Sequence, residues 1–169
     1  MILIVAGVAG SGKTTIGELV AGRLRWRFAD ADDFHPEANV AKMRAGIPLT
    51  DEDRLPWLRA IATWIDDRVA AGESAVVSCS ALKRSYRDLL LQDRPAVLLV
   101  FLQVSRAELV RRLSARAGHF FPRQLLDSQL AALEPPQPDE VGVRTVEADG
   151  DASRTAEQVL VLVGPDPAR

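Results

Sequence analysis

The chain opens with an apolar run that leads directly into a glycine-rich loop. The run covers residues 1–6, and the loop over residues 7–14 reads Gly-Val-Ala-Gly-Ser-Gly-Lys-Thr. Glycine adopts backbone conformations that are closed to other residues, so such a loop can turn successive N–H groups toward one bound anion. A helical pattern follows and would add the positive end of its dipole at the same place. The sequence therefore predicts a strand, a phosphate-binding loop and a helix.

The loop also carries a lysine and a hydroxyl where a nucleoside triphosphate needs them. Lys13 would reach the β and γ phosphates, and Thr14 would place its hydroxyl on Mg²⁺. A plain glycine-rich turn is the alternative, and it gives no reason for either side chain. We therefore expect ATP and Mg²⁺ as cofactors. The loop residues expected to bind them are Gly7, Gly10, Ser11, Gly12, Lys13, Thr14 and Thr15.

Composition limits what else the chain can be. Its 169 residues, 47% of them apolar, fit a single domain over residues 1–163 with a loose tail over 164–169. A formal net charge of -2 argues against a general nucleic-acid binder. The one cysteine excludes an internal disulfide and fits a reducing compartment, so we expect a cytoplasmic protein. No apolar run approaches the roughly 18 residues of a membrane span, so no membrane partner is expected.

Strand and helix patterns alternate along the chain. Apolar runs and alternating residues predict strands at 1–6, 26–30, 75–79, 96–102 and 143–146. Helices are expected at 13–24, 36–46, 50–72, 83–93, 105–117, 125–133 and 156–163, two of them opened by capping boxes at Thr50/Asp53 and Ser105/Glu108. This order predicts a three-layer α/β fold with a five-stranded parallel sheet. In such sheets, ligands bind beyond the carboxyl ends of the strands.

Acidic side chains follow the second expected strand, in the sequence Asp-Ala-Asp-Asp-Phe-His over residues 30–35. Because side chains alternate along an extended segment, we expect Asp30 and Asp32 to share one face. One carboxylate would hold Mg²⁺ through water, and the other would accept a hydrogen bond from an attacking hydroxyl. Helix capping and a solvated loop are the alternatives. The catalytic interpretation is favoured because the third strand ends in Ser-Cys-Ser and offers a metal no carboxylate.

Basic residues stand at the starts of two expected helices. Arg54 lies where the helix dipole disfavours a cation, so we expect a carboxylate ligand to hold it there. Lys83 and Arg84 follow the third strand and lie on the same rim. The alternative for each is a solvated helix surface, which we prefer for Arg84.

Arg112 and Arg116 are four residues apart on an expected helix, so they share one face. Like charges repel there unless an anion lies between them, and the phosphates of ATP are the expected anion. The segment 118–122 interrupts the helical pattern, and we expect a helical lid over approximately 112–135 that excludes water. A plain surface helix is the alternative for the arginines. His119 has local packing as an equal alternative to ligand contact.

Three other conspicuous side chains are expected in the core. Trp57 and Trp64 are seven residues apart near an apolar stripe. Cys79 has no matched histidine nearby in the pattern, so we interpret it as a small buried residue and not as a nucleophile.

Several segments form a set that can be compared with known families. They are Gly-Val-Ala-Gly-Ser-Gly-Lys-Thr at 7–14, Asp-Ala-Asp-Asp-Phe-His-Pro at 30–36, Lys-Met at 42–43, Gly-Ile-Pro-Leu-Thr-Asp at 46–51, Asp-Arg-Leu-Pro-Trp-Leu at 53–58, Cys-Ser-Ala-Leu-Lys at 79–83, Tyr-Arg-Asp-Leu-Leu at 86–90, Gly-His-Phe at 118–120 and Ser-Gln at 128–129. Together they resemble the gluconokinase family, from the first strand to about Pro136. Residues after Pro138 carry no transferable motif, and the adenine pocket is not assigned.

The resemblance implies a P-loop kinase fold similar to shikimate kinase and the nucleoside monophosphate kinases. It implies phosphoryl transfer from ATP to the C6 hydroxyl of D-gluconate by a cytoplasmic homodimer, and the product 6-phospho-D-gluconate would feed the pentose phosphate pathway. The catalytic residues would be Lys13, Asp32 and Arg116. The metal ligands would be Thr14 and Asp30. The substrate would contact Asp32, His35, Arg54, Lys83 and His119, and the phosphates would contact Arg112 and Arg116.

Two other interpretations stay open. A shikimate-kinase-like enzyme or a nucleotide kinase would share the architecture and act on another small acceptor. A nucleotide-dependent switch or binding module would use the loop without an acceptor. Against the second, the sequence contains no Asn-Lys-x-Asp guanine-reading segment, and its basic residues surround the expected crevice.

Overall fold

Five parallel strands form the centre of the protein. The computed structural model describes residues 1–115 and 123–164. Within them the strands are β1 (Ile2–Ala6), β2 (Arg27–Asp30), β3 (Ala75–Cys79), β4 (Val97–Gln103) and β5 (Val143–Glu147). Their order in the sheet is β2-β3-β1-β4-β5, and every neighbouring pair is parallel. The predicted five-stranded parallel sheet is confirmed.

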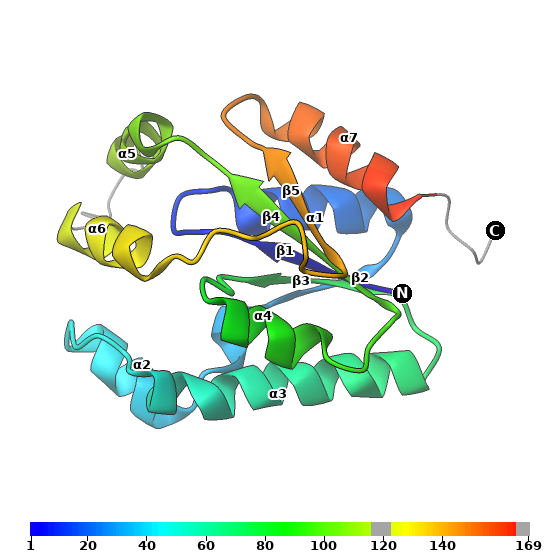
Figure 1. Ribbon diagram of the computed structural model, residues 1–169, viewed down its shortest axis with the longest axis horizontal. Coiled ribbons are helices and arrows are strands. Elements are labelled where there is room, and N and C mark those ends of the chain that lie inside the picture. The colour runs from blue at the N-terminus through cyan, green and yellow to red at the C-terminus, as the bar shows by residue number, and fades with distance from the viewer. Residues whose placement is uncertain (116–122, 165–169) are drawn as a thin grey trace.

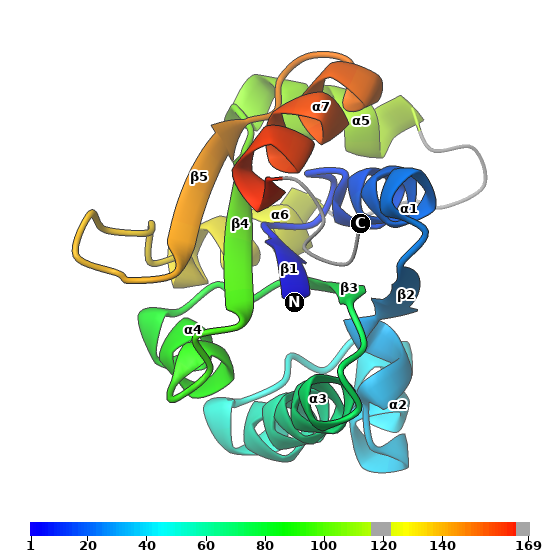
Figure 2. The ribbon, with the colours of Figure 1, turned by 90° about the vertical axis from the view of Figure 1, so that its right-hand side faces the viewer.

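Helices cover both faces of this sheet. They are α1 (Lys13–Leu24), α2 (Glu37–Arg44), α3 (Asp51–Ala70), α4 (Arg84–Leu91), α5 (Arg106–Ala115), α6 (Arg123–Ala132) and α7 (Ala152–Val163), with a 3-10 helix, η1 (Ala31–Phe34), after β2. In Figures 1 and 2, α1 and α7 lie on one side of the strands, and α2, α3 and α4 lie on the other. The three-layer α/β fold is therefore confirmed.

The first apolar run is uniform because β1 is buried on both of its faces. Ile2, Ile4 and Ala6 belong to the cluster beneath α3 and α4. Leu3 and Val5 point the other way, into the cluster beneath α1 and α7. Side chains alternate between the two faces of a strand, so a strand covered on both sides needs an apolar residue at every position.

A third apolar cluster seats α5 and α6 beyond the carboxyl ends of the strands. It joins Val8 of the glycine loop to Leu109 and Leu113 of α5 and to Leu126 of α6. Figure 1 shows both helices at the end of the sheet toward which the strand arrows point. Apolar packing of Val8 thus joins the loop to α5 and α6.

Of the two predicted capping boxes, one is complete. Thr50 and Asp53 exchange both bonds at the start of α3. At the start of α5, the Ser105 hydroxyl accepts from the Glu108 N–H at 3.3 Å, but the Ser105 N–H donates to Asp149 Oδ1 at 2.7 Å. The Glu108 prediction is therefore half wrong, because its carboxylate turns to two arginines of its own helix instead.

A buried ion pair fixes the segment that follows β3. Arg87 of α4 and Glu140 have side chains that are 0% and 2% exposed, and two hydrogen bonds of 2.7 and 2.9 Å join them. Arg87 Nη1 also donates to the carbonyl oxygens of Ala81 and Leu82. The hydrogen bonds from Arg87 lower the pKa of Glu140. Both charges are compensated, and residues 81–82 are tied to the chain around Glu140.

We expect Glu140→Leu to lower the free energy of unfolding by about 3–5 kcal/mol, because it leaves the Arg87 guanidinium charged and unpaired in the interior. Urea unfolding measures this loss. Asp139→Ala is the matched control, since it removes an exposed partner of Arg84 and should cost less than about 1 kcal/mol. A cost at Glu140 no larger than that of the control would contradict the prediction.

Candidate active site

The glycine loop between β1 and α1 has the backbone shape that its composition predicts. Gly7, Gly10 and Gly12 have φ angles of 146°, 83° and 94°. A Cβ atom at Gly7 would lie 2.6 Å from Ser11 Oγ, and one at Gly10 would lie 2.9 Å from Leu113 Cγ. Larger side chains are therefore excluded there by both conformation and space.

Two features of the loop suit it to an anion. The N–H groups at the start of α1 have no acceptor within the helix, as at every helix N-terminus. Ser11 is 0% exposed, and its hydroxyl has no hydrogen-bond partner among the described residues. A buried hydroxyl without a partner is unfavourable, so a ligand oxygen at this place would stabilise it. The residues of the loop therefore fit a bound phosphate.

The side chains of Thr14 and Asp30 meet where β2 ends. The Thr14 hydroxyl donates to Asp30 Oδ2 at 3.0 Å. A hydroxyl and a carboxylate side by side are the hard oxygen ligands that Mg²⁺ prefers, usually together with several waters. Within the described part of the chain, no group of three or more His, Cys, Asp and Glu side chains could enclose a metal. This pair thus suits an ion that also binds phosphate and water.

Asp30 and Asp32 come together by a different geometry from the one predicted. The segment is not extended, because β2 ends at Asp30 and η1 begins at Ala31. Asp30 caps η1 by accepting the Asp32 N–H on Oδ1 at 3.0 Å. Asp32 is raised in pKa, first by burial and then by the nearby Asp30 charge. The two carboxylates are therefore brought together by the turn of 3-10 helix in η1 and not by an extended strand.

His35 follows Asp32 and stacks on Trp57. The two rings are 4.5 Å apart with an interplanar angle of 7°. Trp57 also donates from its indole nitrogen to the Ala31 carbonyl at 2.6 Å. Burial lowers the pKa of His35 and opposes the effect of the Asp32 charge. Trp57 is in the core as predicted, and it also positions the acidic segment, which the helical spacing did not reveal.

Lys83 and Arg54 both act on Asp51, the first residue of α3. Lys83 Nζ donates to the two Asp51 carboxylate oxygens at 2.9 and 2.7 Å, and the Tyr86 hydroxyl donates to Asp51 as well. These hydrogen bonds lower the pKa of Asp51, and the Arg54 charge acts in the same direction. Arg54 itself donates to the Leu49 carbonyl at 3.4 Å.

Asp51 and Tyr86 were not predicted as site residues. The available signal was their position inside two of the family-like segments, 46–51 and 86–90. Arg84, by contrast, points to Asp139 at 2.9 Å, in keeping with the solvated position preferred for it.

Arg112 lies against the glycine loop. Its Nη1 donates to the Ser11 carbonyl at 3.3 Å and its Nη2 to the Ala148 carbonyl at 2.6 Å. Its Nε donates to Glu108 at 2.7 Å, and Arg111 and Arg112 together lower the pKa of Glu108 to about 2. The anion that meets Arg112 inside the protein is therefore Glu108. Arg116 and His119 lie outside the described residues.

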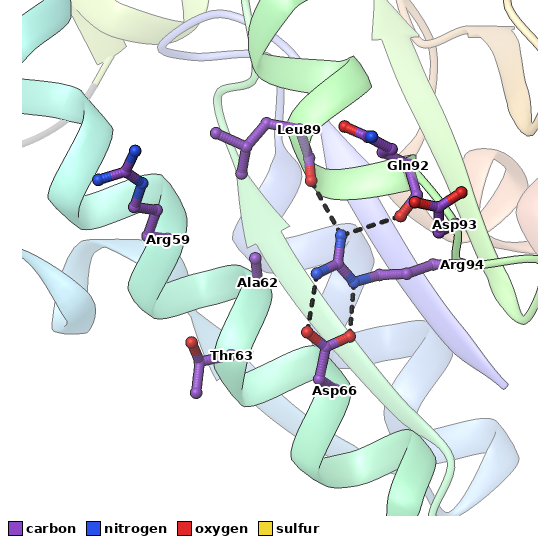
Figure 3. A pocket seen from close by; sticks show the side chains of 8 residues that line it. All are labelled: Arg59, Ala62, Thr63, Asp66, Leu89, Gln92, Asp93 and Arg94. Carbon is purple, nitrogen blue, oxygen red and sulfur yellow. Dashed lines mark hydrogen bonds and ion pairs between the residues drawn. The ribbon is translucent and has the colours of Figure 1, made fainter.

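A separate hollow lies between α3 and the turn that follows α4. It has a volume of about 570 Å³ and is lined by Arg59, Ala62, Thr63, Asp66, Leu89, Gln92, Asp93 and Arg94. Figure 3 shows Arg94 bridging Asp66 of α3 and the carbonyls of Leu89 and Gln92. It contains none of the residues predicted for the active site, and the Arg94 guanidinium is already bound to Asp66 and to two backbone carbonyls.

The fold and this site define a P-loop kinase that acts on small molecules. A family model described as shikimate kinase matches residues 9–161. A gluconokinase from Gluconobacter oxydans is 51% identical over 142 residues, which is 84% of this chain and 80% of that protein. The chain belongs to the gluconokinase family.

Solved structures of related kinases agree with this assignment. A gluconokinase from Sinorhizobium meliloti has a TM-score of 0.83 at 44% identity, covering 95% of this chain and 91% of that one. A sugar kinase from Janibacter sp. has a TM-score of 0.90 at 46% identity, covering 99% and 96%. None of the helices in the described ranges is both long and apolar enough to span a membrane.

Cys79 is the last residue of β3 and is 1% exposed. Burial raises the pKa of its thiol to about 12 from an ordinary value of 9.0. We therefore expect an aromatic disulfide reagent at about pH 8 to label the native protein orders of magnitude more slowly than the urea-unfolded protein. Raising the pH toward 10 should accelerate labelling of the unfolded chain far more, because only its thiol ionises there. Fast stoichiometric labelling of the native protein would show that Cys79 is a reactive thiol.

Proposed function

We propose that the protein transfers the γ-phosphoryl group of ATP to the C6 hydroxyl of D-gluconate. The observation that carries this proposal is the meeting of a phosphate-binding loop, an acidic pair and two basic side chains at one edge of the sheet. The names of the related gluconokinases supply the acceptor. Gluconate offers one carboxylate for a basic anchor and one distant primary hydroxyl for transfer. The homodimer, the cytoplasmic location and the lid over 112–135 belong to the same proposal.

On the nucleotide side, the loop N–H groups, the Ser11 hydroxyl and Lys13 would hold the phosphates. The Lys13 ammonium donates to the carbonyl oxygen of Val8, another loop residue, at 3.0 Å. Thr14 and Asp30 would hold Mg²⁺, which when bound neutralises phosphate charge. Arg112 borders the loop at Ser11 and would stabilise the nucleotide on that flank.

On the acceptor side, Asp32 would orient the attacking hydroxyl and accept its proton. The charge of Lys13 acts on Asp32 and lowers its pKa against the effect of burial, so the two groups are near each other. In a loose phosphoryl-transfer transition state, alignment and cations contribute more than the base does. Arg54 and Lys83 would bind the gluconate carboxylate, while Asp51 and neutral His35 would bind hydroxyls.

A different small acid is the second candidate acceptor. The matching family model is described as shikimate kinase, so a shikimate-like acceptor has a specific observation in its favour. Gluconate is preferred because a gluconokinase is 51% identical to this chain. A panel of shikimate, gluconate, other aldonates and nucleoside monophosphates with MgATP separates the two.

We expect ADP release from MgATP to depend on added D-gluconate. Lys13→Ala should lower the turnover by orders of magnitude, because the charge that meets the β and γ phosphates is removed. A coupled ADP-release assay measures both effects. Gluconate-independent ADP release, or near-normal turnover of the Lys13 variant, would contradict the proposal.

We expect Arg54→Ala to raise the KM for gluconate by about tenfold or more, because a hydrogen bond to a charged group is lost. The KM for ATP should change little. Arg59→Ala is the matched control, since Arg59 is an exposed arginine on the same helix, α3, and lines the separate hollow. Equal gluconate saturation by the wild type and the Arg54 variant would remove Arg54 from the acceptor site.

A further inference from the structure

One hydrogen bond joins α6 directly to the phosphate-binding loop. The backbone N–H of Ala9 donates to Oε1 of Gln129 at 2.7 Å, across 120 positions of the chain. Ala9 lies between the loop glycines Gly7 and Gly10, where an added Cβ atom would come within 2.6 and 2.9 Å of neighbouring atoms. The roles proposed above make no use of Gln129 or of this contact.

Apolar packing delivers Gln129 to this place. Leu126 of α6 is 2% exposed and shares an apolar cluster with Val8, the residue before Ala9. Leu130 and Leu133 pack against the same cluster. Gln129 lies three positions after Leu126 and so on the same side of the helix. The packing of α6 on Val8 therefore places the Gln129 carboxamide beside the next N–H of the loop.

The part of the loop that Gln129 touches is the part that serves the terminal phosphates. Lys13 contacts the β and γ phosphates in loops of this kind. Its ammonium lies at the Val8 carbonyl, 3.0 Å away, immediately before Ala9. The α1 N-terminus lies at the other end of the loop, at Gly12 and Lys13.

The Gln129 carboxamide also has a donor group that the contact with Ala9 does not use. Because the Ala9 N–H is a donor, the oxygen of Gln129 must face it, and the Nε2 group with its two hydrogens is the other arm. Among the residues that the structure describes, Nε2 has no hydrogen-bond partner. An amide can accept from the loop and donate to a phosphate oxygen at the same time, which a carboxylate cannot do.

We propose that Gln129 binds the terminal phosphate of the nucleotide. Its Oε1 holds the loop through Ala9, and its Nε2 donates to an oxygen of the γ phosphate. Gln129 therefore contributes to the binding of a nucleoside triphosphate and not to that of a diphosphate. The inference rests on the proposed function in one respect, that the loop binds a nucleotide.

The test compares two ligands on the full chain by calorimetry, MgADP and Mg²⁺ with a non-hydrolysable ATP analogue. Gln129→Glu keeps the size and the accepting oxygen, loses the donor and adds a negative charge beside the phosphates. We expect this variant to lose about tenfold or more in affinity for the ATP analogue, beyond any loss in affinity for ADP. Ser128→Ala is the matched control, because Ser128 is the exposed neighbour on the same helix, and it should change neither affinity.

The outcomes separate the possibilities. Equal weakening of both ligands, or no weakening of either, would overturn the inference and leave Gln129 as a packing contact between α6 and the loop. Should Gln129→Glu melt well below the wild type, Gln129→Met, of similar volume, gives the same comparison of ligands. A wild-type chain that binds neither ligand would refute the proposed nucleotide site itself, which is a different result from a Gln129 variant with an unchanged ligand ratio.

Discussion

The site depends on the pairing of β1 with strands on both of its edges. In this register Ala6 lies opposite Cys79 of β3 and Phe101 of β4, and Asp30 of β2 lies opposite Ser78. The strands are parallel and end almost level, so the glycine loop, the acidic segment and the residues after β3 leave the sheet at one edge. A shift of β1 by one residue would exchange its two apolar faces, and the burial of both faces resists this.

Most charged groups of the site are oriented by partners within the protein. Lys83 meets Asp51, and Arg112 meets Glu108 and backbone carbonyls. The Lys83 and Asp51 side chains are 29% and 64% exposed, and pairs with this exposure contribute little to stability. Under the proposed function, a gluconate carboxylate would therefore replace Asp51 at Lys83 at low cost, and Asp51 holds the lysine in place beforehand. The Arg87–Glu140 pair is different, because it is buried and fixes the backbone just before Lys83.

Local patterns predicted the elements well and their side-chain partners less well. The Thr50–Asp53 box is local, since both bonds lie within one turn, and the structure has it as expected. The Ser105–Glu108 box has an identical spacing, yet Asp149 from the chain after β5 takes the Ser105 N–H and leaves Glu108 to the arginines. The spacing of two residues shows which local hydrogen bonds are possible. It does not show whether a residue distant in the chain, such as Asp149, will accept the same N–H.

By itself, the sequence determined the phosphate-binding loop, the five strands and the helices on both faces, because glycine conformation and the periodicity of apolar residues act over a few neighbouring positions. Only the tertiary structure decided which side chains meet. Lys83 and Asp51 are 32 positions apart, Arg87 and Glu140 are 53 apart, and Ala9 and Gln129 are 120 apart. Such contacts are set by how whole elements pack on the sheet, and a helix or strand carries the same periodicity whichever neighbour it is packed against.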